Sequence, residues 1–168
     1  LAVFGASGTP IFDVSKSDFV IDFGSDFLES WISPVEHARQ FSQARSITEH
    51  KDGGATFVYV GARLSLTAGN SDEWLPAKPG TEGILALGIA KAALDQAAKK
   101  GMSVLGAAVF GGLLSKYSAS SVASITEVPA ATITRLGEKM LAADAPVALP
   151  PGIASLTTNA VSTTSAVL

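Results

Sequence analysis

Two polar segments of this sequence are suited to bind a nucleotide, because each follows an apolar run typical of a buried strand. Gly24, Ser25 and Asp26 come directly after the run at residues 19–23, and a longer polar stretch at residues 61–80 follows the run at residues 56–60. In open parallel sheets, ligands bind beyond the carboxyl ends of the strands. We therefore expect these two segments to lie close together at one edge of a sheet.

The stretch at residues 61–80 is longer than a strand-to-helix connection needs to be. It closes with Pro79-Gly80-Thr81 at a predicted helix start. There Thr81 can cap the helix, and free backbone N–H groups can face a phosphate or the edge of a base. The polar residues suited to a nucleotide within this stretch are Arg63, Ser65, Thr67, Asn70 and Asp72.

For the other residues whose side chains could take part in binding or catalysis, we favour structural interpretations. The Gly-rich stretch at residues 5–8 lacks a third glycine and a clear preceding strand, so it is interpreted as a surface turn rather than a phosphate loop. His37 and His50 are expected to be solvated, and Trp31 and Trp74 to be packing anchors. We assign no catalytic residue and no metal ligand.

The composition favours a buried part of a larger assembly over a free-standing soluble protein. The chain has 168 residues, enough for one domain, of which 47% are apolar and 16% charged, against about 25% charged in typical domains. The net charge is −3 and the largest basic cluster is the pair Lys99-Lys100, so we expect no nucleic-acid partner. The absence of cysteine excludes disulfides, thiol catalysis and an iron–sulfur cluster bound by this segment.

The longest charge-free apolar stretch, at residues 101–115, contains four glycines. It is shorter than the roughly 20 residues that span a bilayer, so we expect no membrane span here. The chain begins at Leu1 without a signal-peptide pattern, and we expect an internal fragment. Residues 1–156 are expected to form an α/β domain of nucleotide-cofactor type, and residues 157–168 to begin the next helix, which the fragment truncates.

The apolar periodicity predicts an α/β fold. Strands are expected at residues 19–23, 56–60 and 145–149, and helices at residues 34–45, 81–100, 122–127 and 130–143, with a further one beginning in the last twelve. This order indicates a Rossmann-like parallel sheet flanked by helices, as a fragment of a larger multidomain subunit.

The helix at residues 34–45 carries clear start signals. Ser33 and Glu36 have the spacing of a capping box, and Pro34 suits the first helical position. The face expected to be buried consists of Val35, Ala38, Phe41 and Ser42. Arg39 and Arg45 are expected on the solvent side.

The stretch at residues 62–82 resembles a signature of the molybdopterin oxidoreductase superfamily. That signature runs Asp-Pro-Arg, three residues, Thr-Ala, two residues, Ala-Asp, and on to Arg-Pro-Gly-Thr-Asp. The residues in register with it, without a gap, are Arg63, Thr67-Ala68, Asp72 and Pro79-Gly80-Thr81. Residues 18–35 are similar to one branch, the large subunits of alternative complex III and of related periplasmic menaquinone reductase complexes. The resemblance covers most of the chain and is strongest over residues 18–83.

The resemblance implies a site for molybdopterin guanine dinucleotide. In members that carry the cofactor, the equivalents of Gly24, Ser25 and Asp26 lie near the phosphates of the pterin dinucleotide. The equivalents that lie around its guanosine are Arg63, Thr67, Asp72, Gly80, Thr81 and Glu82. An acidic group at Glu82 can accept hydrogen bonds from guanine N–H groups.

Two departures from the signature bear on this site. Gly61-Ala62 replaces the acidic-Pro pair, so the carboxylate expected at the strand end is missing, and Glu82 stands where the signature has Asp. Arg63 and Asp72 can therefore form either a structural ion pair or live ligand contacts.

A degenerate site and a retained site lead to different expectations. If the site is degenerate, side chains such as Trp74 or Leu64 are expected to fill the emptied pocket. If it is retained, an open cleft is expected beside Gly24 and Arg63.

The resemblance to that branch also implies partners. They are the remainder of the large subunit and the iron–sulfur, cytochrome and membrane subunits of a redox complex, with any iron–sulfur clusters bound elsewhere. The implied complex is linked to menaquinone and anaerobic respiration, and lies on the periplasmic side of the cytoplasmic membrane. Because that branch keeps the fold while lacking the molybdenum cofactor, the leading hypothesis is a scaffold with a degenerate pterin-dinucleotide site.

Two other functions stay open. In the second hypothesis, this domain grips a guanosine in an active molybdenum or tungsten bis-pterin oxidoreductase. A third is a generic nucleotide-binding module, although the absence of Gly-x-Gly-x-x-Gly counts against an NAD site.

Overall fold

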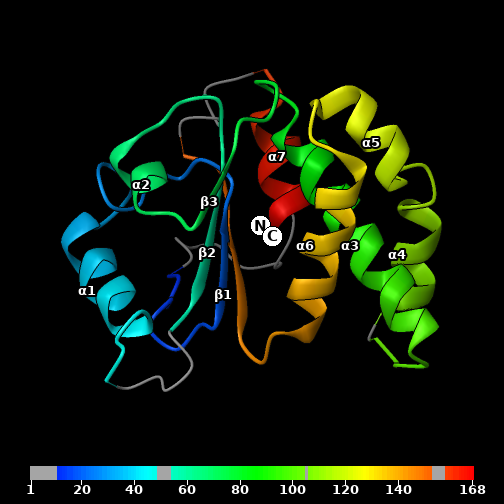
Figure 1. The fold of residues 1–168 in the computed structure, drawn as a ribbon. Helices are drawn as coiled ribbons and strands as arrows, with labels where there is room; N and C mark the ends of the chain where they lie inside the picture. Colours follow the sequence, from blue (N-terminus) through cyan, green and yellow to red (C-terminus); the bar gives the residue numbers. More distant parts are fainter. Residues whose placement is uncertain (1–10, 49–53, 105, 153–157) are drawn as a thin grey trace.

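The central element of the fold is a four-stranded parallel sheet (Figure 1). The computed structural model describes residues 11–48, 54–104, 106–152 and 158–168. In spatial order the strands are β3 (Glu73–Leu75), β2 (Thr56–Val60), β1 (Phe19–Asp22) and β4 (Pro146–Leu149). Ile21 lies opposite Val58 of β2 and Ala148 of β4, so the carboxyl ends of these three strands meet at one edge.

Helices cover both faces of this sheet, which confirms the predicted α/β class (Figure 1). One face is covered by α1 (Pro34–Ala44) and the short α2 (Leu66–Gly69). The helices on the other side are α3 (Glu82–Lys99), α4 (Ala107–Leu113), α5 (Ala119–Thr126), α6 (Ala130–Ala142) and α7 (Ala160–Val167). Within the described residues, no helix combines the length and the apolar character needed to cross a membrane.

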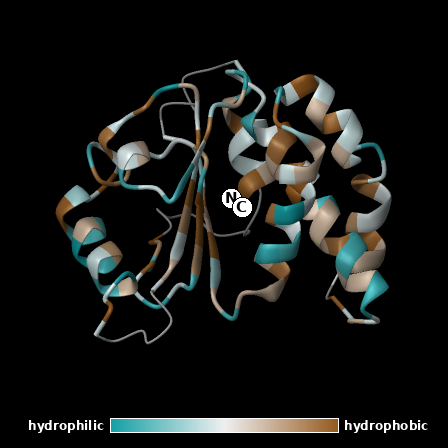
Figure 2. Ribbon diagram, viewed as in Figure 1, coloured by the Kyte–Doolittle hydropathy of each residue, from teal (hydrophilic) through white to brown (hydrophobic). Residues whose placement is uncertain are grey.

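The two central strands are buried on both faces, which explains their nearly continuous apolar sequences. Successive side chains of a strand point to opposite faces. The β1 and β2 side chains that pack toward α3 and α6 are Phe19, Ile21, Val58 and Val60. Those in the cluster on the α1 side are Val20, Phe57 and Tyr59. Figure 2 shows this hydrophobic character along the middle strands.

Three of the four strands were predicted, and β3 was not. The prediction for β2 is confirmed residue for residue, whereas β1 ends at Asp22 and β4 begins at Pro146. β3 has three residues at the sheet edge, and its first side chain, Glu73, pairs with Arg135 of α6. So short a strand carries too little hydrophobic pattern to be recognised. Together with α2, it occupies part of the stretch expected to be a long connection.

Helix α1 has nearly the predicted bounds but a different buried face. Val35 is 85% exposed, and the side packed toward the sheet carries His37, Phe41 and Ala44. These three are spaced by four and three residues and therefore share one face of a helix. The prediction is confirmed for Phe41 and wrong for Val35, Ala38 and Ser42, which are exposed, because the buried face includes a histidine.

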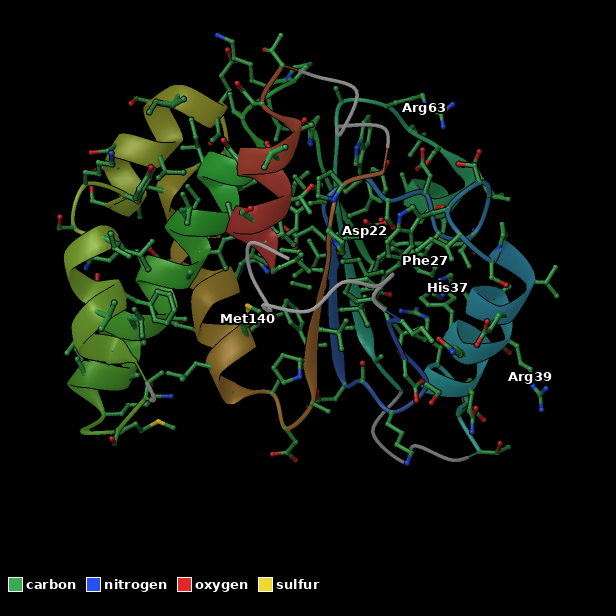
Figure 3. The ribbon with its side chains drawn as sticks, turned by 180° about the vertical axis from the view of Figure 1, so that it is seen from behind. Asp22, Phe27, His37, Arg39, Arg63 and Met140 are labelled. Atoms are coloured by element: carbon green, nitrogen blue, oxygen red, sulfur yellow. The ribbon has the colours of Figure 1, made fainter. Side chains whose placement is uncertain are left out.

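The expectation that His37 is solvated is therefore wrong. Its side chain is buried, stacks on Trp31 with 5.4 Å between ring centroids, and meets Phe27 edge-on at 6.1 Å. Figure 3 shows His37 and Phe27 in the layer between α1 and the sheet, with Arg39 pointing outward as predicted. Trp31 serves as the packing anchor that was expected.

The predicted side-chain caps of α1 and α3 are absent. The side chain of Ser33, whose φ is −142° and ψ is 80°, makes no cap hydrogen bond. Only its backbone carbonyl takes part in the helix start, where it accepts from the N–H of His37 (3.0 Å). The hydroxyl of Thr81 donates instead to the carbonyl of Lys78 (2.6 Å). In both places the sequence signal is correct for a helix start, and local backbone geometry directs the hydroxyl elsewhere.

The other predicted helix boundaries hold closely. α3 ends before Gly101, whose φ of +67° suits a helix stop. α5 begins at Ala119, earlier than predicted, because the hydroxyl of Ser118 accepts from the N–H of Ser121 (3.3 Å). The interpretations of residues 5–8 and of His50 lie outside the described residues.

Helix α3 is the centre of the helical layer, and small residues let its neighbours approach closely. It packs against α5, α6 and α7. A Cβ atom added to Gly137 of α6 would lie 2.7 Å from the Cβ of Ala92 and from the backbone nitrogen of Ala93. Similar close approaches occur at Gly88 against Val122 and at Gly83 against Thr163.

We expect Gly137→Ala to lower the free energy of unfolding by about 1–3 kcal/mol, because the added methyl group overpacks the contact between α3 and α6. The matched control is Gly111→Ala in α4, where an added Cβ meets nothing within 4 Å. That change should leave stability unchanged or raise it by up to about 1 kcal/mol. Chemical denaturation of both variants measures the difference, and equal effects would contradict the close contact.

Candidate functional site

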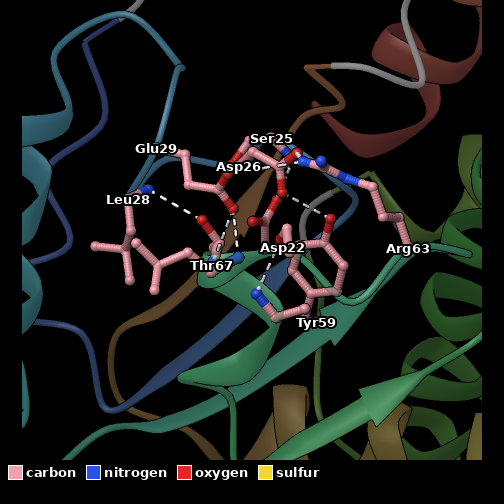
Figure 4. Close-up of polar contacts among 11 residues, drawn as sticks. Asp22, Ser25, Asp26, Leu28, Glu29, Tyr59, Arg63 and Thr67 are labelled. Carbon is pink, nitrogen blue, oxygen red and sulfur yellow. Dashed lines mark hydrogen bonds and ion pairs between the residues drawn. The ribbon is translucent and has the colours of Figure 1, made fainter.

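The candidate site lies at the edge where the carboxyl ends of β1, β2 and β4 meet (Figure 4). Gly24 has a φ of +84°, and the turn that it opens lies against the end of β2, where a Cβ on Gly24 would be 3.6 Å from the carbonyl oxygen of Val60. The N–H of Gly152, after β4, donates to the carbonyl of Gly24 (3.0 Å). The two segments singled out from the sequence are therefore neighbours in space.

Asp26 is the polar centre of this edge. It is buried and has a positive φ of 55°. Its Oδ1 accepts from the hydroxyl of Tyr59 (2.8 Å), and its Oδ2 from the guanidinium of Arg63 (3.0 Å). Burial, together with the hydrogen bond to Asp26, raises the pKa of Tyr59 and keeps its hydroxyl a donor. Asp26 thus joins the end of β1 to the end of β2.

A second set of contacts joins the same turn to α2. Glu29 accepts hydrogen bonds from the N–H groups of Leu66 and Thr67 at the start of α2, and its carboxylate lies 3.7 Å from Arg63. The hydroxyl of Thr67, which is fully buried, accepts from the N–H of Leu28 (3.1 Å). The backbone donors at the start of α2, where an anionic ligand would bind, are therefore used by Glu29.

Asp22, the last residue of β1, was not predicted as a site residue. It is completely buried; its Oδ1 accepts from the N–H of Ser25 (2.7 Å), while Oδ2 has no hydrogen-bond partner. The hydroxyl of Ser25 is likewise buried without a partner. Burial, with a smaller contribution from the charge of Asp26, raises the pKa of Asp22 to about 7, and hydrogen bonding from Ser25 opposes this rise.

Asp72 lies away from this edge, at the amino end of β3. It pairs with both terminal nitrogens of Arg45 (2.6 and 2.8 Å) and accepts from the N–H of Phe57 (2.7 Å). The hydrogen bonds from Arg45 lower the pKa of Asp72. Asp72 and Arg63 thus form ion pairs with different partners, and Arg45, expected on the solvent side, ties α1 to the sheet.

Gly80, Thr81 and Glu82 form a second group at the start of α3. Gly80 has a φ of +82°, which favours glycine at this turn. Glu82 is buried, and its Oε2 has no hydrogen-bond partner. Because Leu75 ends β3 at the same edge as the other parallel strands, the chain from β3 to Glu82 starts from that edge.

The structure therefore divides the nine predicted site residues into three places. Gly24, Ser25, Asp26, Arg63 and Thr67 meet at the strand ends, Gly80, Thr81 and Glu82 lie at the start of α3, and Asp72 lies at the amino end of β3. Sequence reasoning missed Asp22 and Tyr59, because both lie inside apolar runs that indicate core.

Neither side chain expected to fill a degenerate pocket lies buried in one. Leu64 is 61% exposed. Trp74 is partly exposed, and its indole N–H donates to the carbonyl of Gly61 (2.8 Å). At this edge Arg63 forms an ion pair with Asp26, and a Cβ added to Gly152 would lie 2.5 Å from the carbonyl oxygen of Ser25.

Comparison with known proteins identifies the family of this chain. The family model described as molybdopterin oxidoreductase matches residues 4–136, which is most of the chain. The chain belongs to the molybdopterin oxidoreductase family. Membership implies a molybdopterin cofactor in the family's working enzymes.

Among curated relatives, the menaquinone reductase molybdopterin-binding-like subunit of Nitratidesulfovibrio vulgaris (strain Hildenborough) is 33% identical over 150 residues, 88% of this chain. The molybdopterin-containing subunit ArrA of the arsenate respiratory reductase of Shewanella sp. (strain ANA-3) is 34% identical over 83 residues, 49% of this chain. The chain spans 21% and 9% of the lengths of these relatives, respectively.

A solved structure shares the fold. Acetylene hydratase from Pelobacter acetylenicus superimposes with a TM-score of 0.66 over 90% of this chain and 20% of its own, at 19% sequence identity. The parallel sheet with helices on both faces is thus a fold found within that enzyme.

The raised pKa of Asp22 predicts a pH-dependent stability. Because its folded value of about 7 lies above the ordinary value of 3.8, an unfolded chain releases this proton first as the pH rises. The folded state is therefore relatively most stable below the ordinary value and loses stability as the pH rises toward about 7. Asp22→Asn should remove this loss and melt at least about 2 °C above the unmodified protein at pH 8.

The measurement is thermal unfolding of both proteins between pH 5 and pH 8, read as their difference so that other titrating groups cancel. The matched control is Asp13→Asn, an exposed carboxyl whose pKa is lowered, chiefly by hydrogen bonding from Ser15. A difference between Asp22→Asn and the unmodified protein that does not change with pH would contradict the assignment.

Proposed function

We propose that this chain is part of the large subunit of a membrane-associated redox complex linked to the quinone pool, on the periplasmic side of the membrane. In this function the domain is a scaffold, and its strand-end edge is a degenerate pterin-dinucleotide site. The relative in N. vulgaris, a menaquinone reductase subunit of molybdopterin-binding-like type, supports this context across 88% of the chain.

The observation that carries the proposal is that charged side chains at the strand ends pair with one another. Asp26 and Glu29 place two carboxyl groups beside one guanidinium, that of Arg63. A pyrophosphate would add negative charge beside buried carboxylates, where charge repulsion is weakly screened. The residues present therefore do not fit the phosphate end of a pterin dinucleotide.

The closed turn supports the same conclusion. The N–H groups that begin α2 donate to Glu29, and the N–H of Ser25 donates to Asp22. Gly152 lies against Ser25 so closely that no side chain fits there. Backbone donors that a phosphate would need are thus already in use.

Partners of this domain are, in this proposal, the remainder of its subunit and the iron–sulfur, cytochrome and membrane subunits of the complex. Because the chain has no cysteine, thiolate ligands for iron–sulfur clusters must come from other segments. Electron transfer in anaerobic respiration with menaquinone would then pass through centres held elsewhere, and this domain would hold the subunit in shape.

The test is a cofactor analysis of the intact protein that contains this chain. We expect molybdenum and tungsten well below stoichiometric amounts in elemental analysis. We also expect little fluorescence from oxidised pterin released by acid, in a preparation that still transfers electrons to menaquinone. An active molybdopterin reductase carried through the same procedure is the positive control. Stoichiometric metal and pterin would overturn the proposal that this domain is a scaffold.

A second candidate function, a domain that grips the guanosine of a molybdenum or tungsten bis-pterin enzyme, is favoured by Glu82. This buried carboxylate has an oxygen without a hydrogen-bond partner, and burying an unpaired acceptor is costly. Two N–H groups of a guanine would supply the missing donors. The guanosine end of the site thus fits a ligand better than its phosphate end.

Glu82→Gln tests this second function, because the amide replaces one charged acceptor with a donor. If the domain grips guanosine, pterin retained after gel filtration should fall about tenfold or more, while Glu82→Asp, the residue of the family signature, should retain it. Thermal unfolding of each variant controls for folding. Equal pterin retention in Glu82→Gln and the unmodified protein would exclude the guanosine contact.

A further inference from the structure

The helical side of the sheet carries an exposed apolar surface on α4 and the segment before it. Met102 is 49% exposed, Val109 67%, Phe110 53% and Leu113 65%. No residue of α4 is buried, and the helix lies on the outside of the layer against α3 (Figure 1). We call these four side chains the α4 patch.

The chain presents this patch through two turns with positive φ. Gly101 (φ +67°) ends α3, and Gly106 (φ +77°) precedes the first residue of α4. Two alanines precede Val109, and Gly111 and Gly112 lie between Phe110 and Leu113; nothing lies within 4 Å of a Cβ added at either glycine. The bulky side chains therefore project from a helix whose other residues are small.

Lysines flank the patch along the chain. Lys99, Lys100 and Lys116 are exposed on either side of it along the chain, and no acidic residue occurs between Asp95 and Glu127. This is notable in a chain whose net charge is −3. We call the three lysines the lysine rim. Glu138 of α6, which accepts from Gln96, is an acidic group next to Lys100 on the neighbouring helix.

We propose that the α4 patch and its lysine rim dock on an anionic lipid surface. Apolar side chains of a surface helix enter the boundary between headgroups and acyl chains, while lysines extend their ammonium groups to the lipid phosphates. The order of groups in this segment, with lysines on both sides of Met, Val, Phe and Leu, matches that arrangement.

A lipid surface fits these groups better than a protein partner. Protein–protein interfaces are depleted in lysine, whereas an anionic membrane surface attracts it. The patch lies on an outward-facing helix. The inference depends only on the α4 patch and the lysine rim, and holds whether or not the strand-end site binds a pterin dinucleotide.

The experiment is flotation of the full-length polypeptide that contains this chain, purified free of integral membrane subunits, with lipid vesicles. We expect binding to vesicles of phosphatidylglycerol and phosphatidylcholine, little binding to phosphatidylcholine alone, and weaker binding at high salt. Exchanging the three lysines for glutamine should weaken binding to anionic vesicles by about fivefold per lysine.

The apolar part is tested by the double variant F110S/L113S, which should weaken binding about tenfold or more. Its matched control is V35S, which removes an even more exposed aliphatic side chain from α1 on the opposite side of the sheet. Thermal unfolding controls for misfolding of the double variant. The lysine exchanges are confined to exposed side chains and test the proposal independently.

Two results would overturn the proposal. One is vesicle binding of the lysine and apolar variants equal to that of V35S. The other is unchanged vesicle binding together with loss of a protein subunit from the purified complex, which would make the occupant of the α4 patch a protein.

Discussion

The strand-end edge depends on one constraint, the buried carboxylate of Asp26 in the turn that follows β1. Asp26 lies in a turn out of contact with water and must be compensated there. Tyr59 supplies a hydroxyl from β2, and Arg63 supplies a guanidinium from the segment after β2. Satisfying this one charge therefore fixes the position of two neighbouring strand ends and of the start of the long connection that follows them.

This requirement also governs what the edge can bind. The parallel sheet brings strand ends and helix starts to one place, which is why ligands usually bind there in such folds. Here the same donors are taken by Asp22, Asp26 and Glu29. The family fold is thus compatible with a strand-end edge whose donors bind carboxylates of the same chain. Glu82 at the start of α3, by contrast, keeps an acceptor oxygen without a hydrogen-bond partner.

The two sides of the sheet are secured by different physics. On the α1 side, aromatic rings and the bidentate ion pair of Arg45 with Asp72 hold the helix to the sheet. On the other side, small residues such as Gly88 and Gly137 allow α3 to pack closely with its neighbours. α4 takes part in neither core, which leaves its apolar side chains and flanking lysines free for another surface.

The sequence alone determined the α/β class, three of the strands, most helix bounds and the nearness of the two polar segments, because long apolar runs and glycine turns are local signals. Tertiary structure decided the rest. α1 buries His37 in place of Val35 because Trp31 and Phe27, outside the helix, provide the rings against which it packs. Asp72 pairs with Arg45 rather than Arg63 because it begins an edge strand too short to be seen in the sequence pattern. Partners of charged groups come from distant segments, so only the folded chain could assign them.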